Sequence, residues 1–234
     1  MIRFVIILLP VFCLLQGCGT DDSDQLATDR NDVADCSNIL SACIDGNGSY
    51  CLFGFKWGET NPIGSGGFDV TGPQEGAEVT YSFQVNNGMV STHSQANLRS
   101  RSLEGLPSCA REEFQNALQA WADVANINFT EMPDNSDTDI KFYTANILQG
   151  GVGYPNYLNM PCSSIAGNVV INANINVTNC ESLRKLFMHE IGHVLGLGHV
   201  LSNNIMHWQF STFRTFEGPQ SGDIEGVVQL YGER

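Results

Sequence analysis

The sequence predicts an α+β fold in which strands and helices enclose a single core. Apolar and polar residues alternate over residues 79–84, 127–131 and 139–143, as is typical of half-buried strands. Two longer stretches, residues 111–124 and a segment that begins near Glu181, carry apolar residues at helical spacing. With 234 residues, 42% of them hydrophobic, the chain can bury one sizeable core.

The elements before the middle of the chain follow from local patterns. Gly and Pro make residues 61–76 a loop that precedes the first strand. In the first helix, Phe114, Leu118 and Trp121 share one face, so this stripe belongs to the core. His93 lies between that strand and that helix in a polar loop segment, where we expect it to be solvated.

The second half of the chain adds a strand at residues 168–173 and a helix with two different faces. Leu183, Phe187 and Ile191 make one apolar stripe of this helix, while His189 points elsewhere. This is the pattern of an amphipathic helix that carries a functional face.

The segment HEIGHVLGLGH places three imidazoles and one carboxylate within reach of one metal ion. On a helix, His189 and His193 lie on one face a turn apart. If the helix continued, His199 would lie about 240° round the axis from His193, so the chain must turn. Gly196 stands where a helix ends most readily. Three His ligands leave a fourth tetrahedral position for water, and Glu190 lies beside it as a general base.

The extended spacing resembles the metzincin signature. The short core His-Glu-x-x-His also arises by chance, and a surface helix with two His is the alternative for that core alone. Gly196 and His199 at their offsets, followed by Met206 seven residues later, match the metzincin zinc motif and its Met-turn. A Met taken singly is weak evidence, because a buried Met usually fills the core.

Residues 53–234 are similar to one metzincin branch, the matrixins or matrix metalloproteinases. In that branch a helix ending in Leu-Tyr-Gly closes the catalytic domain, as SGDIEGVVQLYG does at residues 221–232. KWG at residues 56–58 and VTYSF at residues 79–83 resemble the opening segment and first strand. The resemblance implies a five-stranded mixed, twisted sheet with two long helices, a Met-turn and a C-terminal helix.

The resemblance also implies where a substrate would lie. In metzincins the strand at the place of GGVGYPNY is the sheet edge that borders the cleft, and a free edge can accept an extended peptide. A plain Gly-rich turn is the alternative. The residues given a substrate-binding role are Gly151, Val152, Gly153 and Tyr154 on this edge, and His207, Trp208 and Gln209 in the pocket wall after the Met-turn.

One catalytic zinc is predicted. No His lies between Lys141 and Met188, so the second, structural zinc site typical of animal matrixins has no imidazole ligands here. Structural Ca²⁺ stays open, because the loops are rich in Asp and Asn but show no recognisable ligand set.

The first 17 residues are typical of a secretory signal, with Arg3 ahead of an apolar run that is too short for a usual membrane span. The sequence LQGC before and at Cys18 resembles a bacterial lipobox, with Gln as an imperfect match. We therefore expect an exported protein that is lipid-anchored to the cell envelope, at the outer membrane or cell surface, through Cys18, or secreted if Cys18 is not lipidated.

Residues 18–52 are expected to form an acidic tether, which can also act as a short propeptide, before a catalytic domain at residues 53–234. Removing the signal removes only Arg3 among charged residues, which leaves 10 basic and 25 acidic residues and a net charge of −15. Such a surface repels nucleic acid. The expected partners are a protein or peptide substrate and a membrane, and the chain is expected to be a monomer.

Six cysteines remain beyond Cys18, an even number that favours disulfides in an exported chain. Six cysteines can pair in fifteen ways; we favour Cys162 with Cys180, because both flank the strand before the zinc helix. A metal site formed by Cys36, Cys43 and Cys51 is the alternative, although no C-x-x-C spacing is present.

The sequence thus predicts a zinc-dependent endopeptidase that cleaves extended peptides with a zinc-activated water and Glu190 as general base. Two alternatives are a catalytically inactive zinc-scaffold binding lipoprotein and a zinc amidase that acts on a non-protein substrate. The presence of Glu190 and of all three His argues against the first alternative. The second cannot be separated by sequence.

Overall fold

A computed structural model of the chain describes residues 48–58, 75–86, 88–101, 103–157, 161–177, 179–209 and 216–234. The chain divides into two compact units, Met1–Asn31 and Asp32–Arg234, and every described residue belongs to the second. The predicted signal, the predicted lipidation site Cys18 and most of the predicted tether lie outside the described residues. Within the described part of the chain, no helix is long and apolar enough to cross a membrane.

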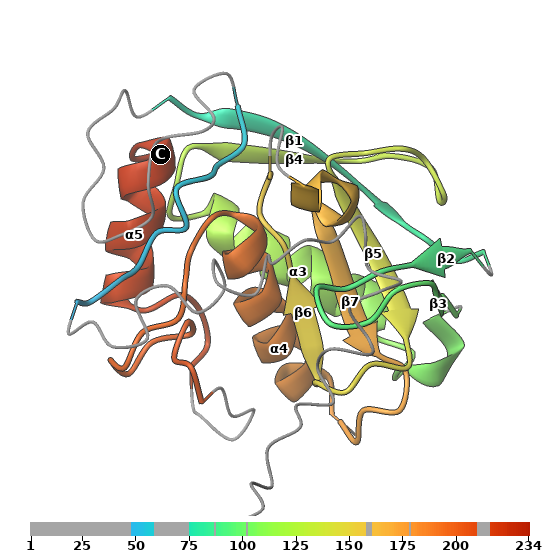
Figure 1. Ribbon diagram of the computed structural model, residues 1–234. Coiled ribbons are helices and arrows are strands. Elements are labelled where there is room, and N and C mark those ends of the chain that lie inside the picture. Colours follow the sequence, from blue (N-terminus) through green and yellow to red (C-terminus); the bar gives the residue numbers. More distant parts are fainter. Residues whose placement is uncertain are drawn as a thin grey trace, which may run out of the picture. The chain divides into compact units, whose positions relative to one another are not determined.

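A five-stranded sheet lies at the centre of this unit (Figure 1), with the strand order β4-β1-β5-β7-β6. Its strands are β1 (Ala77–Phe83), β4 (Ile127–Glu131), β5 (Ile140–Ala145), β6 (Gly151–Gly153) and β7 (Asn168–Asn172). The pairs β4-β1, β1-β5 and β5-β7 are parallel, whereas β6 pairs with β7 antiparallel. The predicted mixed sheet is therefore confirmed, and β4 and β6 are its two edges.

Helices α3 (Ala110–Ala122) and α4 (Cys180–Val194) pack on each other and cover one face of this sheet. Phe114 and Phe187 from these helices meet Phe83 and Phe142 from the sheet, with ring centroids 4.7 to 5.5 Å apart. Aromatic side chains at this spacing bury large apolar areas in favourable edge-on contacts. A third helix, α5 (Ser221–Tyr231), ends the chain, as the resemblance implied.

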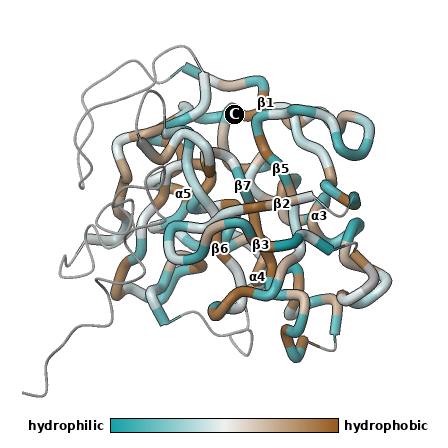
Figure 2. The backbone as a smooth tube through the Cα atoms, turned by 45° about the vertical axis from the view of Figure 1, so that its right-hand side comes forward, coloured by the Kyte–Doolittle hydropathy of each residue, from teal (hydrophilic) through white to brown (hydrophobic). Residues whose placement is uncertain are grey.

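A β-hairpin and a short 3-10 helix border the opposite face of the sheet. The hairpin consists of β2 (Met89–Val90) and β3 (Leu98–Arg99), and the 3-10 helix is η3 (Pro161–Ile165); a second one, η2 (Leu103–Gly105), leads towards α3. Val90 of the hairpin packs in a second apolar cluster with β6 and β7, and Figure 2 brings β2 and β3 forward, in front of these strands. The prediction that His93 is simply solvated is wrong, because this half-buried residue of the hairpin loop contacts buried Tyr154.

The predicted disulfide between Cys162 and Cys180 is also wrong. Cys180 is bonded to Cys109, with the two Cα atoms 6.0 Å apart. Cys109 immediately precedes α3 and Cys180 is the first residue of α4, so the packing of the two helices brings their beginnings together. Cys162 belongs instead to the cluster on the other face of the sheet. Cys51 and Cys162 are disulfide-bonded as well, so Cys51 carries no thiolate for a metal.

Candidate metal centre

Three histidine side chains converge where α4 ends. His189 and His193 come from the last turns of α4, and the chain reverses at Gly196, whose φ of +106° suits a residue without a Cβ. This turn brings His199 back to the helix. The Nε2 atom of His199 lies 3.2 Å from that of His189 and 3.1 Å from that of His193.

Backbone carbonyls orient two of the three rings. Nδ1 of His189 donates a hydrogen bond to the Ile205 carbonyl at 2.7 Å, and Nδ1 of His193 donates to the Leu197 carbonyl at 2.8 Å. Because a carbonyl oxygen can only accept, the proton of each neutral ring must lie on Nδ1. The Nε2 lone pairs of both rings are therefore directed to the point where the three rings meet.

Burial keeps these imidazoles neutral. It lowers the pKa of His189 to about 3 and that of His199 to about 4, and it holds the pKa of His193 well below its usual value. Electrostatic repulsion from His199 lowers the pKa of the other two rings further. All three rings thus offer lone pairs at neutral pH, which is the state that metal ligation requires.

The donor set fits Zn²⁺. The three histidines form a compact group whose ligand atoms all lie within 4.8 Å of one another. In a tetrahedral site with Zn–N bonds of about 2.05 Å, two ligand nitrogens lie about 3.3 Å apart, close to the separations between His199 and the other two rings. The unprotonated Nε2 atoms of His189 and His193 both face the point where the three rings meet, and a cation at that point would attract them, so the arrangement suits a metal.

Glu190 lies beside this group and outside it. Its side chain is only 4% exposed, and burial raises the pKa of its carboxyl to about 8, while a hydrogen bond from the Gly153 N–H works in the opposite direction. A metal dication at the histidines would lower this pKa. A carboxyl poised in this way can both take up and release a proton near neutral pH.

Strand β6 runs directly against Glu190. A Cβ built on Gly151 would lie 2.8 Å from Glu190 Oε1, and one built on Gly153 would overlap the Glu190 main-chain carbonyl. Gly153 must therefore be glycine for the strand to approach α4 this closely, whereas the contacts of a Cβ on Gly151 are with the ends of side chains that can shift.

The four edge residues singled out in the sequence divide into two pairs. Tyr154 N donates to the Asn168 carbonyl of β7, and Val152 lies opposite Val170 in the same antiparallel ladder. Because hydrogen-bonded pairs alternate along such a ladder, Val152 and Tyr154 turn their backbone groups towards β7, and Gly151 and Gly153 turn theirs towards the free edge. The Tyr154 side chain is fully buried on the face away from α4.

Met206 and α5 pack behind the histidine group and hold it in place. Met206 is 2% exposed, and its sulfur and methyl group lie against Gly192 in the zinc helix. The buried Asp223 carboxylate of α5 accepts from Ile205 N at 2.8 Å and from Met206 N at 3.1 Å. Asp223 thus holds the segment whose Ile205 carbonyl orients His189.

Residues 49–57, here called the N-terminal strap, pair with the turn after α4 that leads to His199. Leu52 forms an antiparallel β-bridge with Leu197. Phe53 N donates to the Gly196 carbonyl and Gly198 N to the Cys51 carbonyl, both at 2.8 Å. The Phe53 ring stacks on His193 with centroids 5.6 Å apart and an interplanar angle of 26°.

The strap also completes the end of α4. Trp57 Nε1 donates to the Val194 carbonyl at 3.0 Å, and the Tyr231 hydroxyl of α5 donates to the Leu195 carbonyl at 2.9 Å. Trp57 N in turn donates to that hydroxyl. These bonds satisfy carbonyls that every helix leaves without an intrahelical partner at its C-terminus. Residues 49–52, which the sequence placed in the tether, are therefore packed against the site.

The residues after the Met-turn lie at the rim of the site. His207 is half-buried, and, after burial, electrostatic repulsion from it contributes to lowering the pKa of His189 and His199. Its ring is nearly parallel to that of Trp208, which is 45% exposed, and Gln209 is exposed next to it. Residues 210–215, which follow Gln209, lie outside the described residues.

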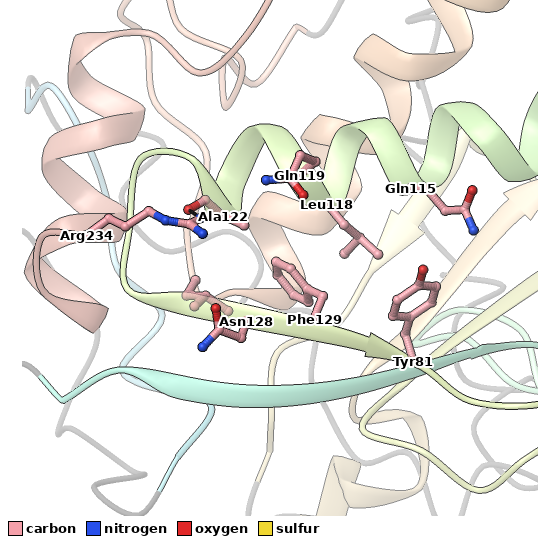
Figure 3. Close-up of a pocket in the computed structure, with 9 residues that line it drawn as sticks. Tyr81, Gln115, Leu118, Gln119, Ala122, Asn128, Phe129 and Arg234 are labelled. Carbon is pink, nitrogen blue, oxygen red and sulfur yellow. Dashed lines mark hydrogen bonds between the residues drawn. The ribbon is translucent and has the colours of Figure 1, made fainter.

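A separate pocket of about 250 Å³ lies between α3 and β4 (Figure 3). Tyr81, Phe129 and Arg234 are among the residues that line it. None of its lining residues belongs to the histidine group or to β6, so it is distinct from the candidate metal centre.

Sequence reasoning missed the supports around the metal ligands. The Ile205 and Leu197 carbonyls, Phe53 and Asp223 were not singled out. Asp223 closes a capping box with Gln220, but these residue types depart from the usual Ser/Thr-x-x-Glu/Gln pattern, so little in the sequence indicated it. The carbonyl contacts depend on how the turn after α4 closes, and no residue type reveals that.

The family model described as Matrixin matches residues 78–232. Among curated relatives, Metalloendoproteinase 2-MMP of Arabidopsis thaliana is 32% identical over 136 residues, which cover 51% of this chain and 36% of that protein. Serralysin A of Dickeya chrysanthemi is 32% identical over 147 residues, covering 50% and 31%. Matrix metalloproteinase-18 of Xenopus laevis is 29% identical over 132 residues, covering 51% and 28%. The chain thus spans about a third of the length of these relatives.

Proposed function

Because the chain belongs to the matrixin family, we propose that it is a zinc-dependent endopeptidase that holds one zinc ion on His189, His193 and His199. The observation that carries the proposal is the meeting of three neutral imidazole nitrogens beside a buried carboxyl and directly under a free strand edge. The names of the relatives, a metalloendoproteinase among them, agree with this activity.

The proposed mechanism assigns proton transfer to Glu190. A bound zinc ion would polarise the scissile carbonyl and lower the pKa of a water molecule at its open position. Glu190 takes the proton of the attacking water and passes it to the leaving amine, for which its raised pKa and its buried position suit it. The Gly153 N–H holds the carboxylate in place before the first transfer and favours the return to the ionised form after the second.

The substrate is proposed to lie extended along β6, with its backbone paired to Gly151 and to the carbonyl of Gly153, because the Gly153 N–H is bonded to Glu190. Its side chain after the cleaved bond would enter a pocket whose outer wall includes His207, Trp208 and Gln209. An apolar preference in that pocket is inferred from the family. Structural Ca²⁺ remains a proposal without a ligand set, since the histidines form the one metal-type group found among the described residues.

The proposal also includes export of the protein and its attachment to a membrane by a lipid. We propose that residues 1–17 direct export and that Cys18 carries the lipid that attaches the protein to the cell envelope. The Cys18→Ser variant should appear unprocessed or soluble, whereas the unaltered chain should sediment with membranes. A soluble unaltered chain with a free amino terminus beyond residue 18 would refute the anchor.

The central test replaces Glu190 and leaves the histidines intact. Glu190→Ala should retain about one zinc per chain but lose at least about 10²-fold of the activity on casein or gelatin. Glu112→Ala, which removes an exposed carboxylate from neighbouring α3, is the matched control and should behave as the unaltered chain. A chelator should abolish activity. Undiminished turnover by Glu190→Ala would refute the mechanism, and two stoichiometric zinc ions would refute the single site.

A further inference from the structure

The loop of the β2–β3 hairpin, residues 91–97, is attached to the substrate edge of the sheet. His93 N donates to the Tyr154 hydroxyl at 2.9 Å, and His93 Nδ1 lies 2.8 Å from the same oxygen. Thr92 also reaches this hydroxyl through its side chain. Nearer the start of β6, Gln95 Oε1 accepts from Leu148 N at 3.3 Å. The loop therefore contacts the chain on both sides of β6.

The loop has its own internal structure. Thr92 N donates to the Gln95 carbonyl at 2.7 Å, and Gln95 N donates to Thr92 Oγ1 at 3.0 Å. Asn97 has a φ of +54°, a left-handed conformation that Asn tolerates in turns, and its N–H donates to Ser91 Oγ. Such a closed turn presents the same surface to a ligand in the free and bound states, which limits the entropy cost of binding.

This loop lies on the face of β6 that points away from the metal. Along β6, a Cβ on Gly151 or Gly153 would point at Glu190, whereas Val152 and Tyr154 belong to the cluster on the opposite face. A peptide added to the free edge continues this alternation. Every second side chain of the peptide then faces α4 and the zinc ligands, and the side chains between them face the hairpin loop.

We propose that residues 92–95, held by the Tyr154 hydroxyl, form the outer wall of the peptide groove and select the substrate side chains that point away from α4. The wall is polar, since the partly exposed residues His93, Ser94 and Gln95 supply its side chains, while Thr92 is buried beneath them. It should therefore favour substrate residues with hydrogen-bonding side chains over aliphatic ones. This inference rests on the proposed function for the place of the peptide, and it assigns Tyr154 a positioning role.

The chain offers a matched pair of variants for the test. Tyr154→Phe removes the hydroxyl that holds the loop and keeps the ring. Tyr157→Phe removes a hydroxyl from another fully buried tyrosine of the same cluster, whose oxygen has no hydrogen-bond partner among the described residues. His93→Ala changes the wall from the loop side and tests the inference even if Tyr154→Phe folds poorly.

Peptides that carry Gln or Leu in turn at each position around the cleaved bond would be assayed for KM and kcat. For peptides with Gln at alternate positions, Tyr154→Phe and His93→Ala should lower kcat/KM about 3- to 10-fold, mainly by raising KM. This fold-change is the size expected for the loss of one hydrogen bond. The same peptides with Leu at those positions, and the Tyr157→Phe variant, should be little affected. Identical positional profiles for Tyr154→Phe and Tyr157→Phe would overturn the proposal.

A binding arm separates this proposal from the catalytic one. Fluorescent versions of the same peptides would be titrated onto zinc-loaded Glu190→Ala protein, with and without His93→Ala. If the unaltered chain cleaves nothing but Glu190→Ala binds peptides with the preference at alternate positions, the endopeptidase proposal fails and the outer wall stands. If no peptide binds, or if His93→Ala leaves all affinities unchanged, the outer wall is refuted.

Discussion

Asp223→Asn tests whether α5 supports the zinc site through the Met-turn. Oδ2 of Asp223 accepts from Ile205 N and Gln220 N, both at 2.8 Å, and Oδ1 accepts from Met206 N at 3.1 Å. An amide of the same shape can keep its oxygen at the position of Oδ2, but its NH₂ group then faces the Met206 N–H. One hydrogen bond to a charged acceptor is lost, worth about 1.5–3 kcal/mol, and a buried donor is left unsatisfied at about 1–3 kcal/mol.

A compensating effect reduces this cost. Burial raises the pKa of Asp223, which means that the ionised carboxylate is poorly solvated in the folded protein and that the neutral amide avoids part of that penalty. The net loss should be about 2–4 kcal/mol. For a domain of this size, that corresponds to a fall in Tm of about 4–16 °C. Zinc affinity should fall about tenfold or more, because the Ile205 carbonyl that orients His189 is no longer fixed.

Scanning calorimetry of the zinc-loaded and zinc-free forms, with a chelator competition for the zinc Kd, measures both effects. Glu225→Gln is the matched control, since Glu225 lies on the same helix and makes a single exposed bond to Ser49 Oγ. Its Tm should change by no more than about 2 °C. If Asp223→Asn also stays within 2 °C of the unaltered protein, or keeps its zinc affinity, the proposed support through the Met-turn is refuted.

Three further predictions follow from other parts of the structure. Gly153→Ala should lower Tm and abolish peptidase activity, because the added methyl group would overlap the Glu190 main-chain carbonyl. Gly218→Ala is the control and should do neither, because no atom lies within 4 Å of the added methyl group. Replacing both Cys109 and Cys180 by Ser should cost about 2–4 kcal/mol in denaturant unfolding; peptide mapping that finds Cys180 bonded elsewhere would contradict the pairing. The zinc-free protein should lose stability as pH falls from about 6.5 towards 4, because the depressed pKa values of the histidines let the unfolded chain bind protons first. Glu190 and Asp223, with their raised pKa values, oppose this loss but are two groups against three; a Tm that does not fall over this range would contradict the prediction.

The parts of the fold that the sequence predicted are those that local geometry decides. The helix period puts His189 and His193 on one face, and alternation identifies β4 as residues 127–131, where the structure has it. The disulfide of Cys180 depends on which helix beginnings meet in space. Cys109 precedes Cys180 by 71 residues, so no local pattern could reveal that pairing.

The sequence also could not predict the environment of a polar residue. His93 lies in a segment of Ser, Thr, Gln and Asn, which indicates a solvated loop. Its contact with Tyr154 exists because the hairpin folds back over a sheet edge 61 residues further along the chain. Composition describes what a segment can tolerate, whereas burial depends on what covers it.

The strap shows how a missed element changes the interpretation of the site. The apolar run that includes Cys51, Leu52 and Phe53 was divided at residue 53 between a tether and a domain, although its length and its Gly boundary are consistent with a short buried strand. In the structure this run pairs with the turn that carries His199, and Ser49 already contacts α5 through Glu225. A propeptide within residues 18–52 can therefore be removed without disturbing the zinc ligands only if cleavage falls before Ser49. Cleavage within the strap would take away the Leu52 bridge or the Phe53 ring and weaken metal binding instead of activating the protein.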